Sequence, residues 1–219
     1  DDLGLGSRQN LGFDVAFDPN EVQEYQWFVD RFVDLAVYYG FESQTARTAD
    51  APAACGWLGR DEPSEPTVSG PCDYSRLVYG VPWSFLRWLA DHLGTALPGG
   101  ENAFFRGMVE ATHPGFAAVE QVLGEPISPL LAGWAASLYT DGRVHGGADP
   151  RLTFPSWDLR GIYQQVFSTA QLQPEARSFA SFSGTRPVAA GSSHYLLLSG
   201  VSRPELAFRV LENSGAALP

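Results

Sequence analysis

Four short segments with helical periodicity follow one another in the middle of the chain. Pro82 suits the first turn of the first segment and Gly94 its end. Phe85, Leu86, Leu89 and Leu93 form its apolar stripe. The other three segments are expected at residues 103–112, 116–123 and 128–140. Because short helices must bury their apolar faces against one another, this succession predicts a compact helical bundle.

The first of these segments, residues 79–94, reads YGVPWSFLRWLADHLG and carries two tryptophans. We interpret its tryptophans and leucines as part of the bundle core. Ser84, Arg87 and Asp91 fall off the apolar stripe, so we expect them to face elsewhere. The fourth segment is expected to open at Ser128, a cap followed by a proline.

An earlier amphipathic helix is expected from Asp18 to Gly40. Asp18 and Glu21 have the spacing of a capping box, and apolar residues then recur every three or four positions. The stretch 42–71 is rich in alanine, proline and glycine and is unusually long for a loop in a compact domain. We interpret residues 1–167 as a helical domain that carries this loop.

The last quarter of the chain has a different pattern. A piece at 159–167, helical or extended, leads into three short apolar runs at 181–184, 195–199 and 206–210, which predict strands. Because isolated strand pairs are marginally stable, these strands must pack on the bundle or belong to a larger unit. The expected fold class is α+β, mainly α: a helical bundle followed by a small antiparallel β segment at 168–219, whose end need not be a natural boundary.

Charge excludes several function classes. The chain has 14 arginines and no lysine against 25 acidic residues, for a net charge of -11. A P-loop, a Schiff-base lysine and a Ser-x-x-Lys hydrolase all need lysine. Without clustered cations the chain is a poor nucleic-acid binder, and no apolar run is long enough to span a membrane. We therefore expect neither a nucleic-acid partner nor a membrane span.

Two cysteines, Cys55 and Cys72, flank part of the long loop. A disulfide between them would stabilise the fold by about 3 kcal/mol in the chain-entropy model. The alternative is two free thiols, and we favour the disulfide because a loop without regular structure gains most from a cross-link. It would place the protein in an oxidising compartment, extracellular or in the cell envelope.

The four histidines, His92, His113, His145 and His194, form no His-Glu-x-x-His motif, the spacing that places two zinc ligands on one helical face. His92 and His113 stand at expected helix ends, where an imidazole interacts favourably with the last carbonyls.

Two further groups of residues contain side chains that could bind a metal or act as a nucleophile. Asp141, His145 and Asp149 are four residues apart, but the glycines around them argue against a helix, so we interpret them as a solvated turn rather than a metal site. Ser193 and His194 are adjacent, and neighbours on a strand point to opposite faces. We therefore expect no metal ligand in this chain. A serine hydrolase or a glycosidase stays an open alternative, although no spacing of residues argues for either.

Several segments resemble one known family. Residues 79–94 are followed by FFRGMV, GFAAVE, WAASLYTD and PSWDLR at 104–109, 115–120, 134–141 and 155–160. In this order they resemble the helical half that follows the zinc-binding helix of gluzincin metallopeptidases, most closely the hyicolysin-like peptidases. Residues 4–11, GLGSRQNL, resemble the stretch just after the second zinc-ligand helix of that family.

The resemblance implies that the chain is the C-terminal part of a secreted zinc metallopeptidase and forms one wall of its peptide-binding cleft. In that family zinc is held by His-Glu-x-x-His and a downstream glutamate, and no residue here matches those positions. We therefore expect zinc and the peptide or protein substrate to be bound through the parent protein, and this chain alone to be inactive. The alternative function is a non-catalytic protein-binding or scaffold domain.

One residue is a candidate for catalysis by resemblance alone. In the aminopeptidase branch of gluzincins, a tyrosine fifteen positions before the glycine that closes this helix stabilises the oxyanion. Tyr79 stands fifteen positions before Gly94. A phenol can donate a hydrogen bond to a developing oxyanion. The alternative is that Tyr79 packs at the entry of the helix, and the sequence leaves the substrate-binding residues unassigned.

Overall fold

The computed structural model of the chain describes residues 31–32, 34–35, 74–143, 149–167, 172, 174–178 and 193–200. The described part is mainly helical, with one two-stranded sheet, which confirms the expected helical character. Residues 31, 32, 34 and 35 are helical, as predicted for the segment from Asp18 to Gly40. The rest of that segment, the loop 42–71, Cys55, Cys72 and His145 lie outside the described residues.

The longest helix, α3, runs from Tyr74–His92 and has Pro82 inside it. The prediction that Pro82 lies in the first turn was therefore wrong. Because proline lacks the N–H group that donates a hydrogen bond inside a helix, the local sequence favoured a helix that starts near Pro82. Close packing of the preceding turn outweighs that cost: a Cβ on Gly80 would lie 2.3 Å from the backbone nitrogen of Leu35. Glycine permits α3 and the helical residues 34–35 to touch at backbone distance.

The remaining helices follow α3 in short steps. They are η1 (Gly94–Ala96), α4 (Gly100–Glu110), α5 (Phe116–Leu123), α6 (Ile127–Thr140), η2 (Pro150–Leu152) and α7 (Leu159–Phe167). The helix predicted at 116–123 has the predicted bounds, and the piece at 159–167, which the sequence left as helical or extended, is the helix α7. Helix α4 begins and ends earlier than expected. Ser128 is not the cap of α6, because the side chain of Glu120 accepts a hydrogen bond from Ile127 N at 2.8 Å and the helix begins there.

Tryptophans form the centre of the core. Of the two that the sequence placed there, Trp88 is fully buried, and Trp83 is partly buried and packs against the core. Trp88, Trp134 and Trp157 are fully buried. The indole of Trp88 donates to the carbonyl of Arg151 at 3.0 Å, so its only polar atom is satisfied. The ring also fills the space above Gly133, where a Cβ would lie 2.8 Å from Trp88. This small-to-large fit brings α3 and α6 together.

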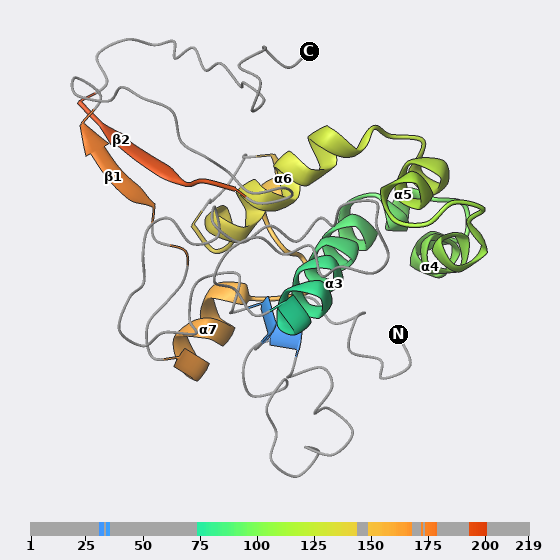
Figure 1. The fold of residues 1–219 in the computed structure, drawn as a ribbon, viewed down its shortest axis with the longest axis horizontal. Helices are drawn as coiled ribbons and strands as arrows, with labels where there is room; N and C mark the ends of the chain where they lie inside the picture. The colour runs from blue at the N-terminus through green and yellow to red at the C-terminus, as the bar shows by residue number, and fades with distance from the viewer. Residues whose placement is uncertain are drawn as a thin grey trace.

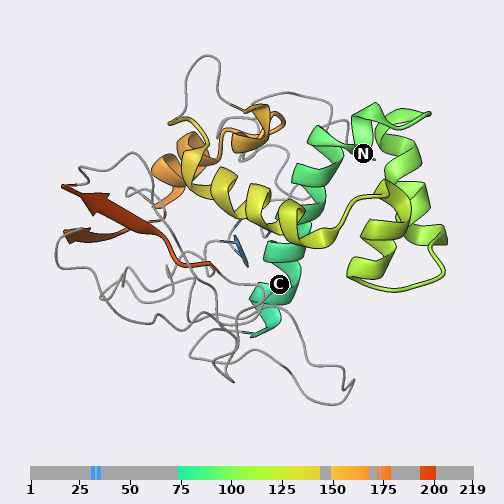
Figure 2. The same ribbon diagram turned by 90° about the horizontal axis from the view of Figure 1, so that it is seen from above.

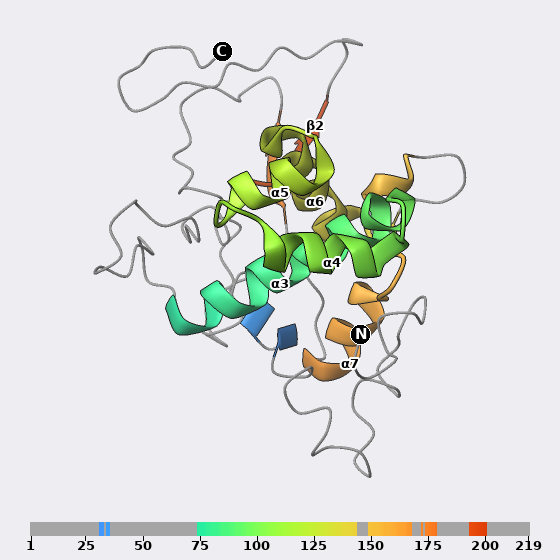
Figure 3. The ribbon, with the colours of Figure 1, turned by 90° about the vertical axis from the view of Figure 1, so that its right-hand side faces the viewer.

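The elements are spread along one long axis. Figure 1 shows α4 and α5 at one end of the molecule and the two strands at the other, with α3 and α6 between them. The view from above in Figure 2 shows α6 crossing beside α3. In Figure 3, seen from the α4–α5 end, α7 lies on the side of the molecule away from α5.

The strands β1 (Glu175–Ser178) and β2 (Leu196–Ser199) pair in parallel, with Glu175 opposite Leu196. The predicted antiparallel arrangement was wrong. The connection from Ser178 to Leu196 exceeds a dozen residues, which is long enough for the crossover that parallel strands require. The strand predicted at 195–199 is present, and those predicted at 181–184 and 206–210 lie outside the described residues.

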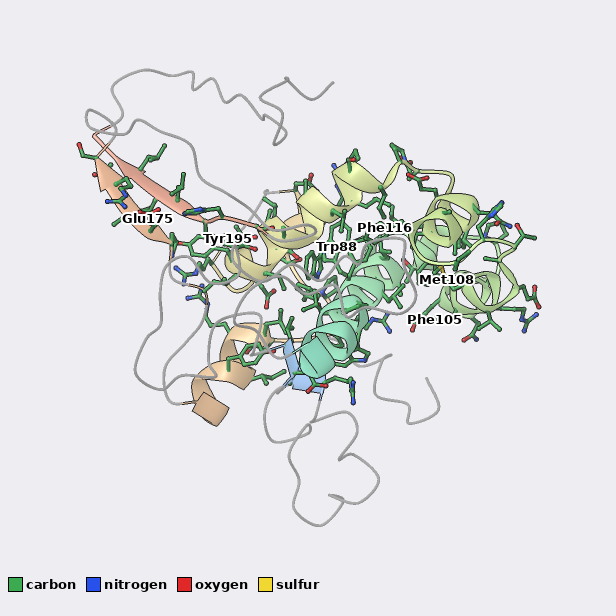
Figure 4. All side chains as sticks on the ribbon, in the orientation of Figure 1. Trp88, Phe105, Met108, Phe116, Glu175 and Tyr195 are labelled. Atoms are coloured by element: carbon green, nitrogen blue, oxygen red, sulfur yellow. The ribbon has the colours of Figure 1, made fainter. Side chains whose placement is uncertain are left out.

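The sheet is tied to the helices at the start of β2. The Tyr195 hydroxyl donates to the carbonyl of Ala135 in α6 at 2.7 Å, and its ring packs near Tyr139. Figure 4 shows Tyr195 beside α6 and Glu175 farther out on the strands. In the described part of the chain, no helix has the length and apolar character needed to cross a membrane.

Candidate functional site

An apolar groove of about 570 Å³ lies between the middle of α3 and the α4–α5 pair. Its apolar walls include Pro82, Phe85, Leu86, Met108, Ala111 and Phe116. Figure 4 shows Met108 on α4 and Phe116 between α3 and α5, at the same end of the molecule. A groove of this volume falls within the range of about 300–1,000 Å³ that is typical of ligand pockets.

The turn between α4 and α5 gives the groove its shape. Gly115 has a φ of 64°, which allows the chain to reverse directly before Phe116 begins α5. The turn is tied to α5 by a hydrogen bond from Thr112 to Gln121 at 3.0 Å. Phe85 lies at the base and meets Phe116 edge to face, with ring centroids 6.1 Å apart. Helices α4 and α5 and the turn between them therefore form an apolar surface that faces α3.

The groove contrasts with the charge of the whole chain. The net charge is -11, yet the residues that line the groove include no carboxylate and no arginine. Its polar side chains are those of Thr112 and His113, which stand exposed at its edge. The groove is therefore suited to holding an apolar group, with one imidazole at the edge that could meet a polar atom.

An ionic network fixes the other end of α4. Arg87 donates from both terminal nitrogens to Glu101, at 2.6 and 2.9 Å, and from two nitrogens to Asp91 at 2.6 and 2.9 Å. Asp91 in turn accepts hydrogen bonds from the backbone and hydroxyl of Ser156 at 3.2 and 2.6 Å. The network joins α3, α4 and the turn before α7, so it sets the distance at which α4 stands from α3.

Burial controls the ionisation of this network. It raises the pKa of Asp91 above its ordinary value, although Arg87 and Ser156 act in the opposite direction. For Arg87, burial alone would lower the pKa, but hydrogen bonds and charges from Glu101 and Asp91 raise it. Arg87 and Asp91 were expected to face away from the apolar stripe. They are buried because they satisfy one another there.

Asp141, the residue that follows α6, is bound to the segment that leads into α7. Its two carboxylate oxygens accept backbone hydrogen bonds from Phe154 and Leu159, both at 3.0 Å. Burial raises the pKa of Asp141 to about 6, and the nearby charge of Asp158 adds to the rise. The predicted solvated turn was wrong for this residue, because the carboxylate is inside and bonds the backbone.

Of the three residues considered as a metal site, Asp141 and Asp149 have other partners, and His145 lies outside the described residues. Asp141 is engaged by backbone amides, and Asp149 pairs with Arg151 at 3.0 Å. No group of three His, Cys, Asp or Glu side chains among the described residues could hold a metal ion. The described residues therefore do not fit zinc, and no chemical step in this part of the chain is assigned to it.

The described histidines lie in different parts of the fold. His92 is the last residue of α3, as predicted, and its Nε2 lies 2.9 Å from the carbonyl of Thr153, the residue that follows η2. His113 lies at the groove, and His194 contacts Glu175 at 2.9 Å. The sequence associated His113 only with a helix end, so its position at the groove was missed.

Tyr79 lies in α3, one turn before the groove. It precedes Pro82 by three residues and Leu86 by seven. Positions with this spacing share one face of an α-helix. The backbone therefore places position 79 on the face of α3 that leads into the groove, and the Tyr79 side chain lies outside what the structure describes.

Comparison with known proteins gives no match: no family model, no curated protein and no solved structure is similar to this chain.

Proposed function

We propose that this chain is the C-terminal part of a secreted zinc metallopeptidase, in which the groove forms one wall of the peptide-binding cleft. The observation that carries the proposal is that Tyr79, Pro82 and Leu86 share one face of α3, and the last two line the groove. The segments that resemble gluzincin peptidases also supply Met108 and Phe116. The residues behind the resemblance therefore build one apolar surface.

In this proposal the work is divided between two parts of the parent protein, the full-length product of the gene. Zinc would have to be held by residues outside the described part, and it would there supply Lewis-acid chemistry. The phenol of Tyr79 donates a hydrogen bond to the oxygen that becomes negative during hydrolysis. The groove residues hold the peptide and exclude water from one side of it.

The test uses the zinc-loaded parent protein and a fluorogenic peptide library. We expect hydrolysis that a chelator abolishes and zinc restores. Tyr79→Phe should lower kcat by roughly 100-fold with little change in KM, because the hydrogen bond is made only in the transition state. Tyr139→Phe is the matched control, since Tyr139 lies on α6 and does not line the groove. Absence of zinc-dependent hydrolysis would contradict the proposal.

A non-catalytic protein-binding domain is the second candidate. It is favoured by the lining of the groove, where Thr112 and His113 are the polar residues and no carboxylate is present to act as a base. The same library separates the two candidates. A parent protein that binds peptides with apolar side chains and leaves them intact, with or without zinc, would support the second.

A further inference from the structure

Met108 connects the last turn of α4 to the core. Its side chain is partly buried and packs against the core cluster. The start of α4 is held in another way, by the ion pair of Glu101 with Arg87 and by the fully buried ring of Phe104. A thioether packs as an apolar group, but one added oxygen atom makes it polar. The packing of the last turn therefore depends in part on the oxidation state of one sulfur atom.

Helix α5 is joined to this last turn. A Cβ on Gly107 would lie 3.1 Å from the side chain of Val122, so the two helices approach closely there. The hydrogen bond from Thr112 to Gln121 ties the intervening turn to α5. The last turn of α4, the turn after it and α5 therefore form one unit, and a change at Met108 affects how this unit packs on α3.

A small oxidant can reach Met108. The residue lines the groove of about 570 Å³, whereas a water molecule occupies about 30 Å³ in the liquid. Hydrogen peroxide transfers one oxygen atom to the sulfur: the S–O bond forms, the O–O bond breaks, the sulfur loses two electrons and water is released. Met108 is the only methionine in the chain, so methionine sulfoxide can form at this position alone.

The sulfoxide would not fit the packing that the thioether makes. Its oxygen is a strong hydrogen-bond acceptor, and the polar side chains that line the groove, Thr112 and His113, are exposed at its edge. A polar group that is buried without a hydrogen bond costs free energy, so the oxidised side chain should turn to water and leave the core.

We propose that Met108 is an oxidation-sensitive switch, whose sulfoxide releases the last turn of α4, together with α5, from α3. The start of α4 stays in place because Glu101 remains paired with Arg87. The proposal does not depend on the proposed peptidase function.

The experiment compares amide hydrogen exchange in the 219-residue chain before and after treatment with hydrogen peroxide. Mass spectrometry verifies the added oxygen on Met108 and measures exchange in peptides. We expect exchange in residues 105–116 to become at least about tenfold faster, because local opening controls exchange, and exchange in residues 85–101 to stay the same. Methionine sulfoxide reductases, one for each epimer of the sulfoxide, should restore the slow exchange.

Three variants separate the sulfur from other effects of the oxidant. Met108→Gln places a polar group there without oxidation and should speed exchange in residues 105–116. Met108→Leu has no sulfur, so its exchange, whatever its own rate, should be the same before and after peroxide. Val109→Gln is the matched control for Met108→Gln, because Val109 is the next residue on α4 and is 86% exposed. It should exchange as the wild-type chain does.

Three results would overturn the proposal. In the first, Met108 carries the oxygen and exchange in residues 105–116 is unchanged. In the second, exchange rises equally in residues 85–101, which would show a general loss of stability and no local release. In the third, peroxide oxidises Met108 in the chain unfolded in urea and leaves it intact in the folded chain.

Discussion

The two ends of α4 differ in how they are held: one is anchored by charged side chains, and the other borders the apolar groove. Near Gly100 the helix is held by the bidentate pair of Arg87 and Glu101. At the other end, near Met108, the helix borders the apolar groove and the polar contact of the turn is the exposed bond from Thr112 to Gln121. Strong polar contacts fix the frame, and the surface left open is apolar and adaptable.

This difference predicts that changes at the centre of the bundle affect stability, whereas changes at the groove affect binding. The stability of the 219-residue chain can be measured as its free energy of unfolding in urea.

Trp88→Ala should have the largest effect. Trp88 is fully buried, and its replacement would leave a cavity between α3 and α6 and remove the hydrogen bond to the carbonyl of Arg151. We expect a loss of about 3–5 kcal/mol. Trp88→Phe should cost less because the ring refills part of the space. A loss below about 1 kcal/mol for Trp88→Ala would contradict the packing of α3 against α6.

Arg87→Met tests the ionic frame. The substitution leaves the carboxylates of Asp91 and Glu101 close together without the cation between them. We expect a loss of about 3 kcal/mol, because removing one partner of a buried ion pair is strongly destabilising. Arg106→Met is the control: Arg106 is exposed on α4, the helix that Arg87 anchors, and its substitution should change stability by less than about 0.5 kcal/mol. Equal effects of the two substitutions would show that the network does not anchor α4.

Asp141→Asn tests the buried carboxylate through pH. Burial raises the pKa of Asp141 from 3.8 to about 6, so the folded protein binds this proton more tightly than the unfolded chain does. Its contribution to stability is complete below about pH 4 and is lost as pH rises through 6, by up to about 3 kcal/mol. Relative to Asp141→Asn, the wild-type chain should therefore become less stable between pH 4 and 7. A change of the opposite sign would contradict the raised pKa.

Met108→Ala should have the smallest effect. Met108 is partly buried at the groove, so its truncation removes little core contact and should cost about 1 kcal/mol or less. The same substitution should weaken binding of an apolar fluorescent dye, whereas Val109→Ala should change neither property. A loss as large as that of Trp88→Ala would show that the groove wall is part of the core.

The sequence predicted helices best where glycine ends them. Gly115 and Gly124, with φ of 64° and 70°, bound α5 at the expected residues. The start of α3 was missed because Pro82 resembles a first-turn proline, and the contact of Gly80 with Leu35 that stabilises the earlier turns is distant in sequence. Strand direction was missed because alternation of side chains is the same in parallel and antiparallel pairs.

The candidate site was predictable only in part. The role of Tyr79 was predicted by resemblance and stays a prediction. The groove could not be predicted, because three separate elements form it and its apolar residues have the spacing of core residues. The buried roles of Arg87, Asp91 and Asp141 could not be predicted, because a charged residue off the apolar stripe usually faces water. Each is inside because its partner comes from another element.

Met108 has a further use that follows from its place in the groove. It is the only methionine in the chain. Labelling the methionine methyl group with carbon-13 would therefore give a single NMR signal from the 219-residue chain, and that signal would come from the groove wall. Its chemical shift would report directly on anything that enters the groove, without a change to any residue.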